Sequence, residues 1–541
     1  MAKANQKIGL RHTGRPVDRL AKAGSSLRWN RQPRTLIVLG QMPNYTPPIV
    51  AAPPDAIAAT SGPANRMRAA LLLLGGGLLA LVVLALLVIN RGGDEGQPRP
   101  VPLQNVQVGE ETDEAIIRAS STPVVSVNPA NGSNLVMGYR IERPSFGCAV
   151  ATSFDEGRSW DPSSLTLPPG TERCYTTSLA FAKDGTLHLA FVTLAGVANV
   201  PSAAWLTRSN DGGRTFQPAT KVLEQEKFMV RLAVDDNTSP PRLLLTWVEP
   251  ASIGLFQMAP PSSVMAMVSP DGGATFSPRV RVSDAGRDRV GAPVPLVGSG
   301  GALHVVYQDY GKDVFDFQNV QGRYEGTFET VIATSSNGGS SFSETVIDAN
   351  VRPPEPFLVF TPPFPAIAAD REAKKLYVAW SDAREGKPAV LMTMSSDGGK
   401  SWGSAKRVDD DRGEALLPQL SVAPNGRLDV AYVRVGEGAG RPTEVMLTSS
   451  RDKGKTFGPA QAMNRPFFRE LLPISSRREA GRDLGSALAL TSKDLVAYVA
   501  WPDTRRGGSD TLRVDIVGAA ATIEGKGATR RPRSVVTQQG K

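Results

Sequence analysis

The sequence predicts an all-β fold, a seven-bladed β-propeller built from four-stranded antiparallel blades, with an N-terminal transmembrane helix and a disordered cytoplasmic tail ahead of it. Two repeats and one apolar segment support this prediction. A turn motif occurs six times at intervals of 55 to 66 residues, a strand pattern occurs seven times, and residues 69–89 are uncharged and mainly apolar. Repetition at such a period is typical of propellers and other repeat folds.

The turn motif reads Ser-x-Asp-x-Gly-x-(Ser/Thr)-(Trp/Phe). An Asp or Asn at its third position accepts a hydrogen bond from a backbone N–H two residues on, Gly supplies a positive φ, and the aromatic ring anchors the turn. Each copy therefore predicts a hairpin corner in which the acidic residue is structural. The third position is held by Asp155, Asp211, Asp271, Asn337, Asp397 and Asp452.

The strand pattern is a short apolar run that ends in an aromatic residue. Another apolar run lies upstream of it, and a third strand, the turn motif and a fourth strand follow downstream. Four short strands per unit without helical periodicity match a propeller blade. The seven copies cover residues 135–139, 187–191, 243–247, 303–307, 376–380, 428–432 and 497–501.

The seventh unit has only three strands, the last near residues 514–517, and it lacks the turn motif. Residues 105–110 read as a fourth strand for which no neighbouring unit has a place. We expect this N-terminal strand to complete the last blade, because that pairing closes the ring and removes exposed sheet edges. This arrangement gives seven blades, and a six-bladed ring is the alternative.

The turn motifs resemble the Asp boxes, or BNR repeats, of the sialidase superfamily, and the resemblance covers roughly residues 102–520. In that family the Asp box is structural and lies away from the catalytic face. Similar repeats occur in sortilin-like receptors, photosystem assembly factors and xyloglucan hydrolases, while the sialidases themselves typically have one blade fewer than we count. The resemblance therefore implies the fold and leaves the activity open.

Residues 69–89 are long enough to cross a hydrocarbon layer of about 30 Å as a helix. A cleaved signal peptide starting at Met67 is the rival interpretation. Residues 1–68 hold eleven Lys or Arg and two Asp, so this segment has a net charge of +9. The whole chain also has a net charge of +9, so the remaining residues sum to zero. By the positive-inside rule, the N-terminus is cytoplasmic and the propeller extracytoplasmic in a single-pass cell-membrane protein.

These features divide the chain into five parts. They are a basic, Pro/Ala-rich disordered tail (1–68), a transmembrane helix (69–89), a linker (90–101), the propeller (102–520) and a basic disordered C-terminal tail (521–541). Because the basic excess lies in the first part, the high isoelectric point predicts no nucleic-acid ligand for the propeller. The oligomeric state is not encoded in any motif.

The two cysteines, Cys148 and Cys174, both fall in the region of the first blade. Outside the cytoplasm they can form a disulfide, and two buried free thiols are the alternative. The three histidines, His12, His188 and His304, are scattered along the chain. Neither residue type has the spacing of metal ligands, so we expect no metal site and no cofactor.

Charged residues recur where the second strands of the units end. In a propeller the loops that leave these strands gather around one end of the central channel. We therefore predict a ligand-binding face for a glycan or a protein there, with the alternative that each Asp–Arg pair only orders its own loop. Its candidate residues are Glu249, Asp309, Asp382, Arg384, Asp503 and Arg505.

A sialidase-like activity would demand more. The resemblance implies an arginine triad, a tyrosine nucleophile paired with a glutamate, and an aspartate acid/base. The family's Phe/Tyr-Arg-Ile-Pro phrase has only the partial counterpart Tyr139-Arg140-Ile141-Glu142, so no catalytic residue is assigned. Two functions remain: a membrane-anchored binding module without catalysis, and an exo-sialidase-type glycoside hydrolase. Three arginines around a Tyr–Glu pair on one face would favour the hydrolase.

Overall fold

The computed structural model describes the propeller and the segment that leads into it. The described residues are 97–108, 117–143, 145–196, 199–224, 226–252, 259–311, 326–354, 364–438, 441–468, 488–505 and 512–524. They all belong to the second of two compact units, Leu81–Lys541. The predicted cytoplasmic tail and transmembrane helix lie outside these residues. From Gln97 onward, no helix of the described part is long and apolar enough to span a bilayer.

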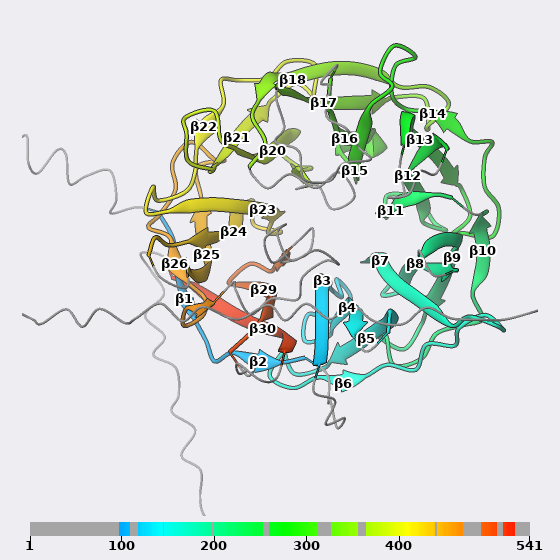
Figure 1. Cartoon of the computed structure of the whole chain (residues 1–541), viewed down its shortest axis with the longest axis horizontal. Coiled ribbons are helices and arrows are strands. Elements are labelled where there is room, and N and C mark those ends of the chain that lie inside the picture. The colour runs from blue at the N-terminus through cyan, green and yellow to red at the C-terminus, as the bar shows by residue number, and fades with distance from the viewer. Residues whose placement is uncertain are drawn as a thin grey trace, which may run out of the picture. The chain divides into compact units, whose positions relative to one another are not determined.

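The described chain forms seven blades that follow one another around a central axis (Figure 1). Blade 1 contains β3 (Ile117–Val127), β4 (Leu135–Arg143), β5 (Gly147–Ser153) and β6 (Asp161–Pro162). Blade 2 contains β7 (Arg173–Phe181), β8 (Leu187–Ala195), β9 (Val200–Ser209) and β10 (Thr220–Leu223). Blade 3 contains β11 (Phe228–Asp235), β12 (Arg242–Ser252), β13 (Ala259–Ser269) and β14 (Val280–Arg281).

The later blades repeat this plan. Blade 4 contains β15 (Val290–Val297), the 3-10 turn η1 (Ser299–Gly301), β16 (Leu303–Asp309), β17 (Phe328–Ser335) and β18 (Ser343–Val351). Blade 5 contains β19 (Ala366–Asp370), β20 (Lys375–Asp382), β21 (Ala389–Ser395) and β22 (Lys406–Arg407). Blade 6 contains β23 (Glu414–Val422), β24 (Leu428–Val435), β25 (Pro442–Ser450), β26 (Gln461–Ala462) and β27 (Phe467–Phe468). Blade 7 contains β28 (Ala489–Ser492), β29 (Val496–Asp503) and β30 (Leu512–Glu524).

The ring closes through the N-terminal segment, as the sequence predicts. Strands β1 (Arg99–Pro102) and β2 (Val106–Gln107) both pair with β30 in antiparallel fashion and supply the fourth strand of blade 7. The first strand of each blade contacts the first strand of the next, from β3 through β28 and back to β3. The alternative of six blades is thereby excluded.

The closing strand is longer than the sequence pattern indicates. β1 begins at Arg99, inside the segment interpreted as a linker, and β30 continues to Glu524, beyond the boundary placed at 520. The two extensions pair with each other, Arg99 opposite Glu524. Neither extension can be recognised as a strand from its own sequence, because its stability comes from the hydrogen bonds that the other strand supplies.

Five of the six turn motifs share one hydrogen-bond pattern between the third and fourth strands, and the sixth, in blade 4, shares most of it. In blade 2, Ser209 Oγ donates to Asp211 Oδ1 (2.7 Å), Gly213 N–H donates to Ser209 Oγ (2.9 Å), and the Thr215 hydroxyl donates to Asp211 Oδ2 (2.6 Å). Gly212 and Gly213 have φ of 75° and 91°, conformations that favour glycine. Blade 4 differs, because Asn337 Nδ2 donates to Ser341 Oγ at the position where Asp accepts.

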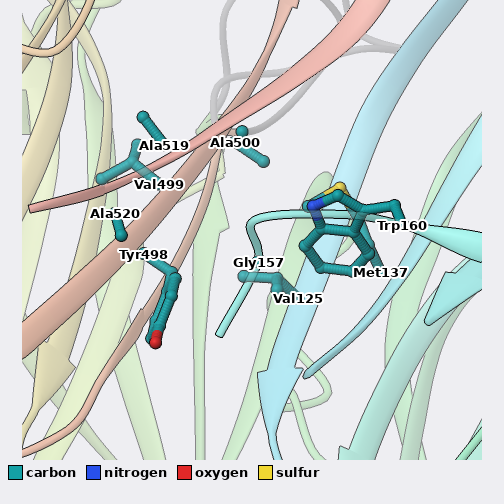
Figure 2. A pocket seen from close by; sticks show the side chains of 10 residues that line it. Val125, Met137, Gly157, Trp160, Tyr498, Val499, Ala500, Ala519 and Ala520 are labelled. Atoms are coloured by element: carbon teal, nitrogen blue, oxygen red, sulfur yellow. The ribbon is translucent and has the colours of Figure 1, made fainter. Parts of the chain in front are cut away.

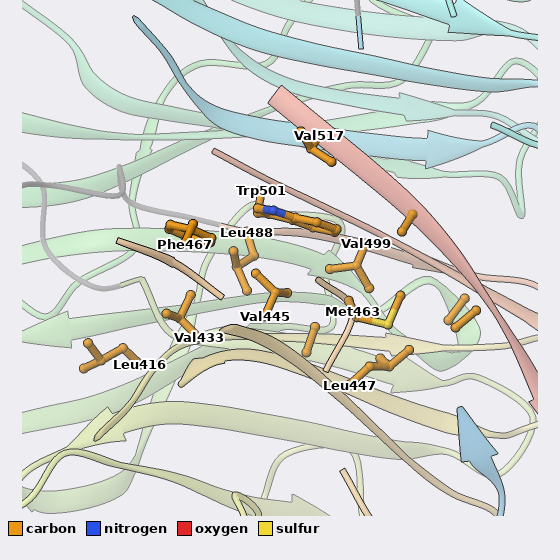
Figure 3. Packing of buried hydrophobic residues seen from close by; sticks show 14 of the residues in the cluster. Leu416, Val433, Val445, Leu447, Met463, Phe467, Leu488, Val499, Trp501 and Val517 are labelled. Carbon is orange, nitrogen blue, oxygen red and sulfur yellow. The ribbon is translucent and has the colours of Figure 1, made fainter. Parts of the chain in front are cut away.

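The core lies between neighbouring blades. Figure 3 shows the cluster between blades 6 and 7, where Trp501, Phe467 and Val445 pack together. Blade 7 brings no turn motif to this interface. Arg427 and Asp429 form a fully buried ion pair there instead (2.8 Å), and Arg427 also donates to the backbone oxygens of Lys493 and Asp494.

A disulfide joins the first two blades. Cys148 on β5 and Cys174 on β7 are bonded to each other, with their Cα atoms 5.3 Å apart. The bond connects the third strand of blade 1 to the first strand of blade 2, so it links the two blades directly.

Candidate functional site

The two ends of the propeller are built from different connections. Because the strands of a blade are antiparallel, the turn motifs and the hairpins between first and second strands share one end. The loops that follow the second strands, and the segments that lead into the next blade, share the other end. We call the latter the channel-mouth end, and all six predicted ligand-binding residues lie on it.

Asp382 and Asp503 occupy equivalent positions at this end. The indole N–H of Trp380 donates to Asp382 (3.1 Å), and that of Trp501 donates to Asp503 (2.9 Å). The two carboxylate side chains are only 1% and 3% exposed. A buried carboxylate requires cationic or hydrogen-bonding partners, and the arginine two residues further on supplies one in each loop.

Arg384 and Arg505 are held by these carboxylates. The Arg384 backbone N–H and Nε both donate to Asp382 at 2.8 Å, and Arg505 donates to Asp503 in the same way at 2.9 Å. These contacts fold each loop back onto its own strand. They are the arrangement expected if the pairs order their loops.

Glu249 and Asp309 are also neutralised locally. Glu249 accepts from Trp247 (3.2 Å) and lies 3.2 Å from Lys227 and 3.0 Å from Arg279. Burial raises its pKa, but these donors and cations outweigh burial, and the pKa lies below its usual value. Asp309 lies 2.5 Å from Arg287 Nη1. No described hydrogen bond or ion pair joins one of these acidic residues to another across the channel.

A different cluster of side chains lines the channel mouth. The guanidinium carbon of Arg231, on β11 of blade 3, lies 4.5 Å from the ring centre of Phe364, just before β19 of blade 5. The contact joins blade 3 to the start of blade 5, and blade 4 lies between these two blades in the ring. The contact therefore lies on the channel side of blade 4. On blade 1, the guanidinium carbon of Arg140 lies 5.7 Å from the ring centre of Phe146.

Tyr175, on β7 of blade 2, completes this channel-mouth cluster. Arg140 and Arg231 both act electrostatically on its hydroxyl, one from each neighbouring blade. Burial raises the pKa of Tyr175, while the two cations oppose the shift. Burial also lowers the pKa of Arg231 to about 10, against the opposite effect of Tyr175. Two cations and a phenol thus share one half-buried environment, which strengthens their interaction with an anion.

Bulges in the first strands help to place these side chains. The pairing of β11 with β12 shifts between Phe228 and Arg231, where Met229 has a φ of 53°. The pairing of β7 with β8 shifts next to Tyr175, between Thr176 and Ser178. A bulge bends a strand and re-aims the side chain beside it. The sequence holds one signal of this site: Arg231 is the single charged residue between Phe228 and Val234.

A hydrogen-bonded Tyr–Glu pair lies near an arginine in the described part of the chain, but it is buried inside the fold. The Tyr307 hydroxyl donates to Glu344, and Arg287 Nε donates to the same carboxylate (2.9 Å). Tyr307 is completely inaccessible, and burial and Glu344 raise the pKa of its hydroxyl well above the usual value. A nucleophile needs access and a lowered pKa or a nearby base. The pair therefore braces blade 4.

The cavities of the described part of the chain include a small enclosed one and an open pocket. Figure 2 shows residues that line the enclosed cavity, among them Trp160 of blade 1 and Tyr498 of blade 7, and its volume of about 10 Å³ holds roughly one water molecule. The other is an open pocket on the outer rim, lined by Arg505, Asn105 and Arg465 among others. Arg505 is one of the six predicted residues, and it lines this pocket.

A long connection follows β16 in blade 4, and its residues 312–325 lie outside the described residues. Tyr310 at its start is 2% exposed and packs edge-to-face on Phe328, with ring centres 4.9 Å apart. Tyr310 therefore belongs to the core. Among the described His, Cys, Asp and Glu residues, no group of three or more could hold a metal ion.

Several solved structures are similar in fold. A protein of unknown function from Dyadobacter fermentans has 12% identity and a TM-score of 0.46, covering 79% of this chain and 99% of its own. The endosialidase of phage phi92 has 11% identity and a TM-score of 0.44, covering 82% and 72%. The α-L-arabinanase of Penicillium chrysogenum has 17% identity and a TM-score of 0.40, covering 64% and 98%. Similarity at this level transfers no activity.

No curated protein matches the sequence. The family model that matches is the BNR repeat-like domain, over residues 242–474. This range contains the turn motifs of blades 3 to 6, whose hydrogen bonds repeat those of blades 1 and 2. Residues 242–474 therefore match a BNR repeat-like domain, and the chain is a seven-bladed propeller whose turn motifs have the pattern of Asp boxes.

Proposed function

We propose that this protein is a membrane-anchored, extracytoplasmic binding module that captures an acidic glycan at its channel mouth. The observation that carries the proposal is the convergence of Arg140, Tyr175 and Arg231 from three blades. Arginine is the side chain best suited to a carboxylate, because its planar fork donates two parallel hydrogen bonds. A guanidinium has several donors, so it can bind a ligand in addition to its existing contacts.

The ligand class follows from the mixture of groups. Two cations, Arg140 and Arg231, act electrostatically on the phenol of Tyr175, and this combination suits a carboxylate with hydroxyls beside it, the pattern of an acidic sugar. The stacking of Arg140 on Phe146 and of Arg231 on Phe364 restricts both guanidinium groups. Side chains restricted before binding lose less conformational entropy when the ligand arrives. In this proposal, the loops that contain Asp382 with Arg384 and Asp503 with Arg505 support the site and do not contact the ligand.

Binding is favoured over hydrolysis because the tyrosines do not suit a nucleophile. Burial raises the pKa of Tyr175 despite its two arginines, and Tyr307 is inaccessible. Recognition of a carboxylate needs neither a nucleophile nor a proton donor. The alternative function is an exo-sialidase-type hydrolase, and the experiments below distinguish it from a binding module.

The test is a glycan array probed with the purified full-length protein, in which each acidic glycan is printed beside its carboxyl-reduced form. We expect capture of acidic forms only, and loss of capture in Arg140→Gln and Arg231→Gln. Arg158→Gln is the matched control, because its side chain is 70% exposed and belongs to a turn motif at the opposite end. Capture that survives both channel-mouth substitutions contradicts the proposal.

A fluorogenic sialoside assay separates binding from catalysis. Tyr175→Phe removes one hydroxyl and keeps the ring, so a binding module should retain most of its capture. A hydrolase that uses Tyr175 as its nucleophile would lose all turnover with the same change. Turnover by the unmodified protein would establish the hydrolase.

The anchoring part of the proposal rests on the apolar run 69–89 and the basic segment before it. Protease added to intact cells should digest the propeller and leave the N-terminal segment protected. If the propeller resists digestion until the cells are opened, the propeller is cytoplasmic and the proposed orientation is wrong.

A further inference from the structure

The sixth Asp box, at the turn end of blade 6, holds a side chain from another part of the protein. Gln97 Nε2 donates to Asp452 Oδ2 (2.9 Å) and to Thr456 Oγ1 (2.6 Å), while Arg451 N–H donates to the Gln97 side-chain oxygen (3.0 Å). Gln97 lies just before β1, so the box binds a residue more than 350 positions away along the chain.

The three contacts make a complete match for a primary carboxamide. A carboxamide has one acceptor oxygen and an NH₂ group that donates twice. The box supplies one donor, the N–H of the residue after its first serine, and two acceptors, the carboxylate and the hydroxyl that ends the motif. A glutamate at this position would place its charge beside Asp452, so the box distinguishes the amide from the acid.

The boxes of blades 2 and 5 present the same groups to solvent. In blade 5 these are Ser396 N–H, the Asp397 carboxylate and the Ser401 hydroxyl, which donates to Asp397 Oδ2 as Thr456 does to Asp452. In blade 2 they are Asn210 N–H, Asp211 and Thr215. All six residues are exposed. Within the described residues, the N–H groups of Asn210 and Ser396 have no hydrogen-bond acceptor.

The other boxes differ in one group each. In blade 3 the residue after the first serine is Pro270, which has no N–H. In blade 4, Asn337 offers its amide N–H where the others offer a carboxylate. In blade 1 the corresponding residue is Phe154, whose half-buried ring packs against Arg214, with the guanidinium carbon 3.5 Å from the ring centre.

We propose that the Asp boxes of blades 2 and 5 are docking sites for glutamine side chains of an extended protein partner. Gln97 is the intramolecular example of the ligand. A single carboxamide makes a weak contact, so a partner that presents glutamines repeatedly gains affinity by engaging both boxes. This surface lies at the turn end, opposite the channel mouth, and the proposal is independent of the glycan site.

The probe is a densely immobilised peptide with the sequence Gly-Gln-Pro-Arg, which copies residues 96–99, and its control is Gly-Glu-Pro-Arg. Retention of the purified full-length protein is measured by weak-affinity chromatography. We expect retention on the glutamine peptide and none on the glutamate peptide. Equal retention on both peptides overturns the proposal, and so does retention on neither.

The chain itself supplies matched substitutions that are compatible with the fold. Ser396→Pro with Asn210→Pro copies blade 3, where the box forms with Pro270 in place. Asp397→Asn with Asp211→Asn copies blade 4. Each pair should abolish retention while the thermal unfolding curve stays close to that of the parent. A folded variant of either kind that is retained like the parent contradicts the proposal.

Gln97→Ala tests the same recognition from the other side. This change vacates the sixth box and adds a third docking site, so retention on the glutamine peptide should increase. The increase should disappear when Arg451→Pro is added. Unchanged retention in Gln97→Ala would show that the contact with Asp452 depends on the chain connection and not on the carboxamide.

Discussion

The Nε atom of Arg384 lies 2.8 Å from Oδ2 of Asp382, a carboxylate that is 1% exposed and that also accepts from the indole of Trp380. The arginine is the main cation beside this buried charge, and a second carboxylate, Asp348 of blade 4, lies 2.7 Å from its Nη2. The pair therefore connects two blades at the channel-mouth end.

Replacing Arg384 and Arg505 with Ala should destabilise the propeller. Each change leaves a buried carboxylate with fewer donors, at a cost of about 1–3 kcal/mol per site. The sequence pattern alone predicts a loss of ligand capture with stability nearly intact. Chemical denaturation decides between the two expectations. Arg412→Ala is the control, because that side chain is 78% exposed. A double variant as stable as this control would restore the ligand-binding interpretation.

Arg427→Met should cost about 3–5 kcal/mol of unfolding free energy, because it leaves Asp429 charged and buried. The double change Arg427→Met with Asp429→Leu should cost less than the single one, since it removes both charges. Equilibrium unfolding in urea measures both variants. Equal losses would mean that Ser449 and Ser492, which also donate to Asp429, satisfy the carboxylate without the arginine.

Stability should decline in mild acid because of two buried histidines. Burial lowers the pKa of both His188 and His304 from 6.5 to about 4. For His188 the nearby Arg208 acts in the same direction, and Asp184 opposes it. A lowered folded-state pKa means that the unfolded chain binds the proton more readily. The histidine contribution is therefore intact above pH 6.5 and is lost as the pH falls toward 4.

The loss should reach about 1.4 kcal/mol per pH unit for each histidine within this window. His188→Leu with His304→Leu should flatten the pH dependence, and Leu244 already occupies the matching position in blade 3. Unfolding free energies at several pH values provide the measurement. The Asp-box carboxylates titrate lower, with the pKa of Asp271 at about 2, so they do not obscure this window. A slope that survives the double substitution would refute the assignment.

Removing residues 1–108 should expose the edge of β30 and cause aggregation or a large loss of stability. An unpaired strand edge is a template for pairing with another chain. The control is a chain that begins at Gly96, which keeps β1, β2 and Gln97. Size-exclusion chromatography and thermal unfolding compare the two chains. A shortened chain that stays monomeric and equally stable would show that the ring does not depend on this strand.

Cys148→Ala with Cys174→Ala should reduce stability by roughly 3 kcal/mol, the chain-entropy value for a loop of this size. The bond spans 26 positions and joins blade 1 to blade 2. Reduction of the unmodified protein should lower its melting temperature by the same amount as the double substitution. If reduction changes nothing, the bond does not form in the purified protein.

Much of the fold could be predicted from the sequence because its information is local. The corner of blades 1 to 6 is specified by residues close together in the sequence. In blade 5, Ser395, Asp397, Gly399 and Ser401 make the hydrogen bonds that the turns share. The sequence predicts the closing strand around Val106, because the strand pattern there has no neighbouring unit to pair with and the last blade lacks a fourth strand. Its upstream half at Arg99 was missed, since a strand of that composition forms only beside β30.

The candidate site could be predicted only in part. The sequence predicts that Asp382 and Arg384 lie at the channel-mouth end, and the structure places them there, because every second strand ends on that side of the propeller. Whether the pair faces a ligand or braces a loop depends on Trp380 and on Asp348 of another blade. These partners are set by packing, and sequence spacing carries no information about which of them is close.

What the sequence determined by itself is the blade, its number of copies and the closure of the ring, because turn chemistry and strand alternation act over a few residues. What only the tertiary structure decided is the meeting of Arg231 with Phe364, and of Arg140 and Tyr175 beside them. These residues come from different blades, and only the closed ring brings their strands around one channel. The bulge at Met229 lies beside Arg231 on β11, and no local sequence rule specifies it.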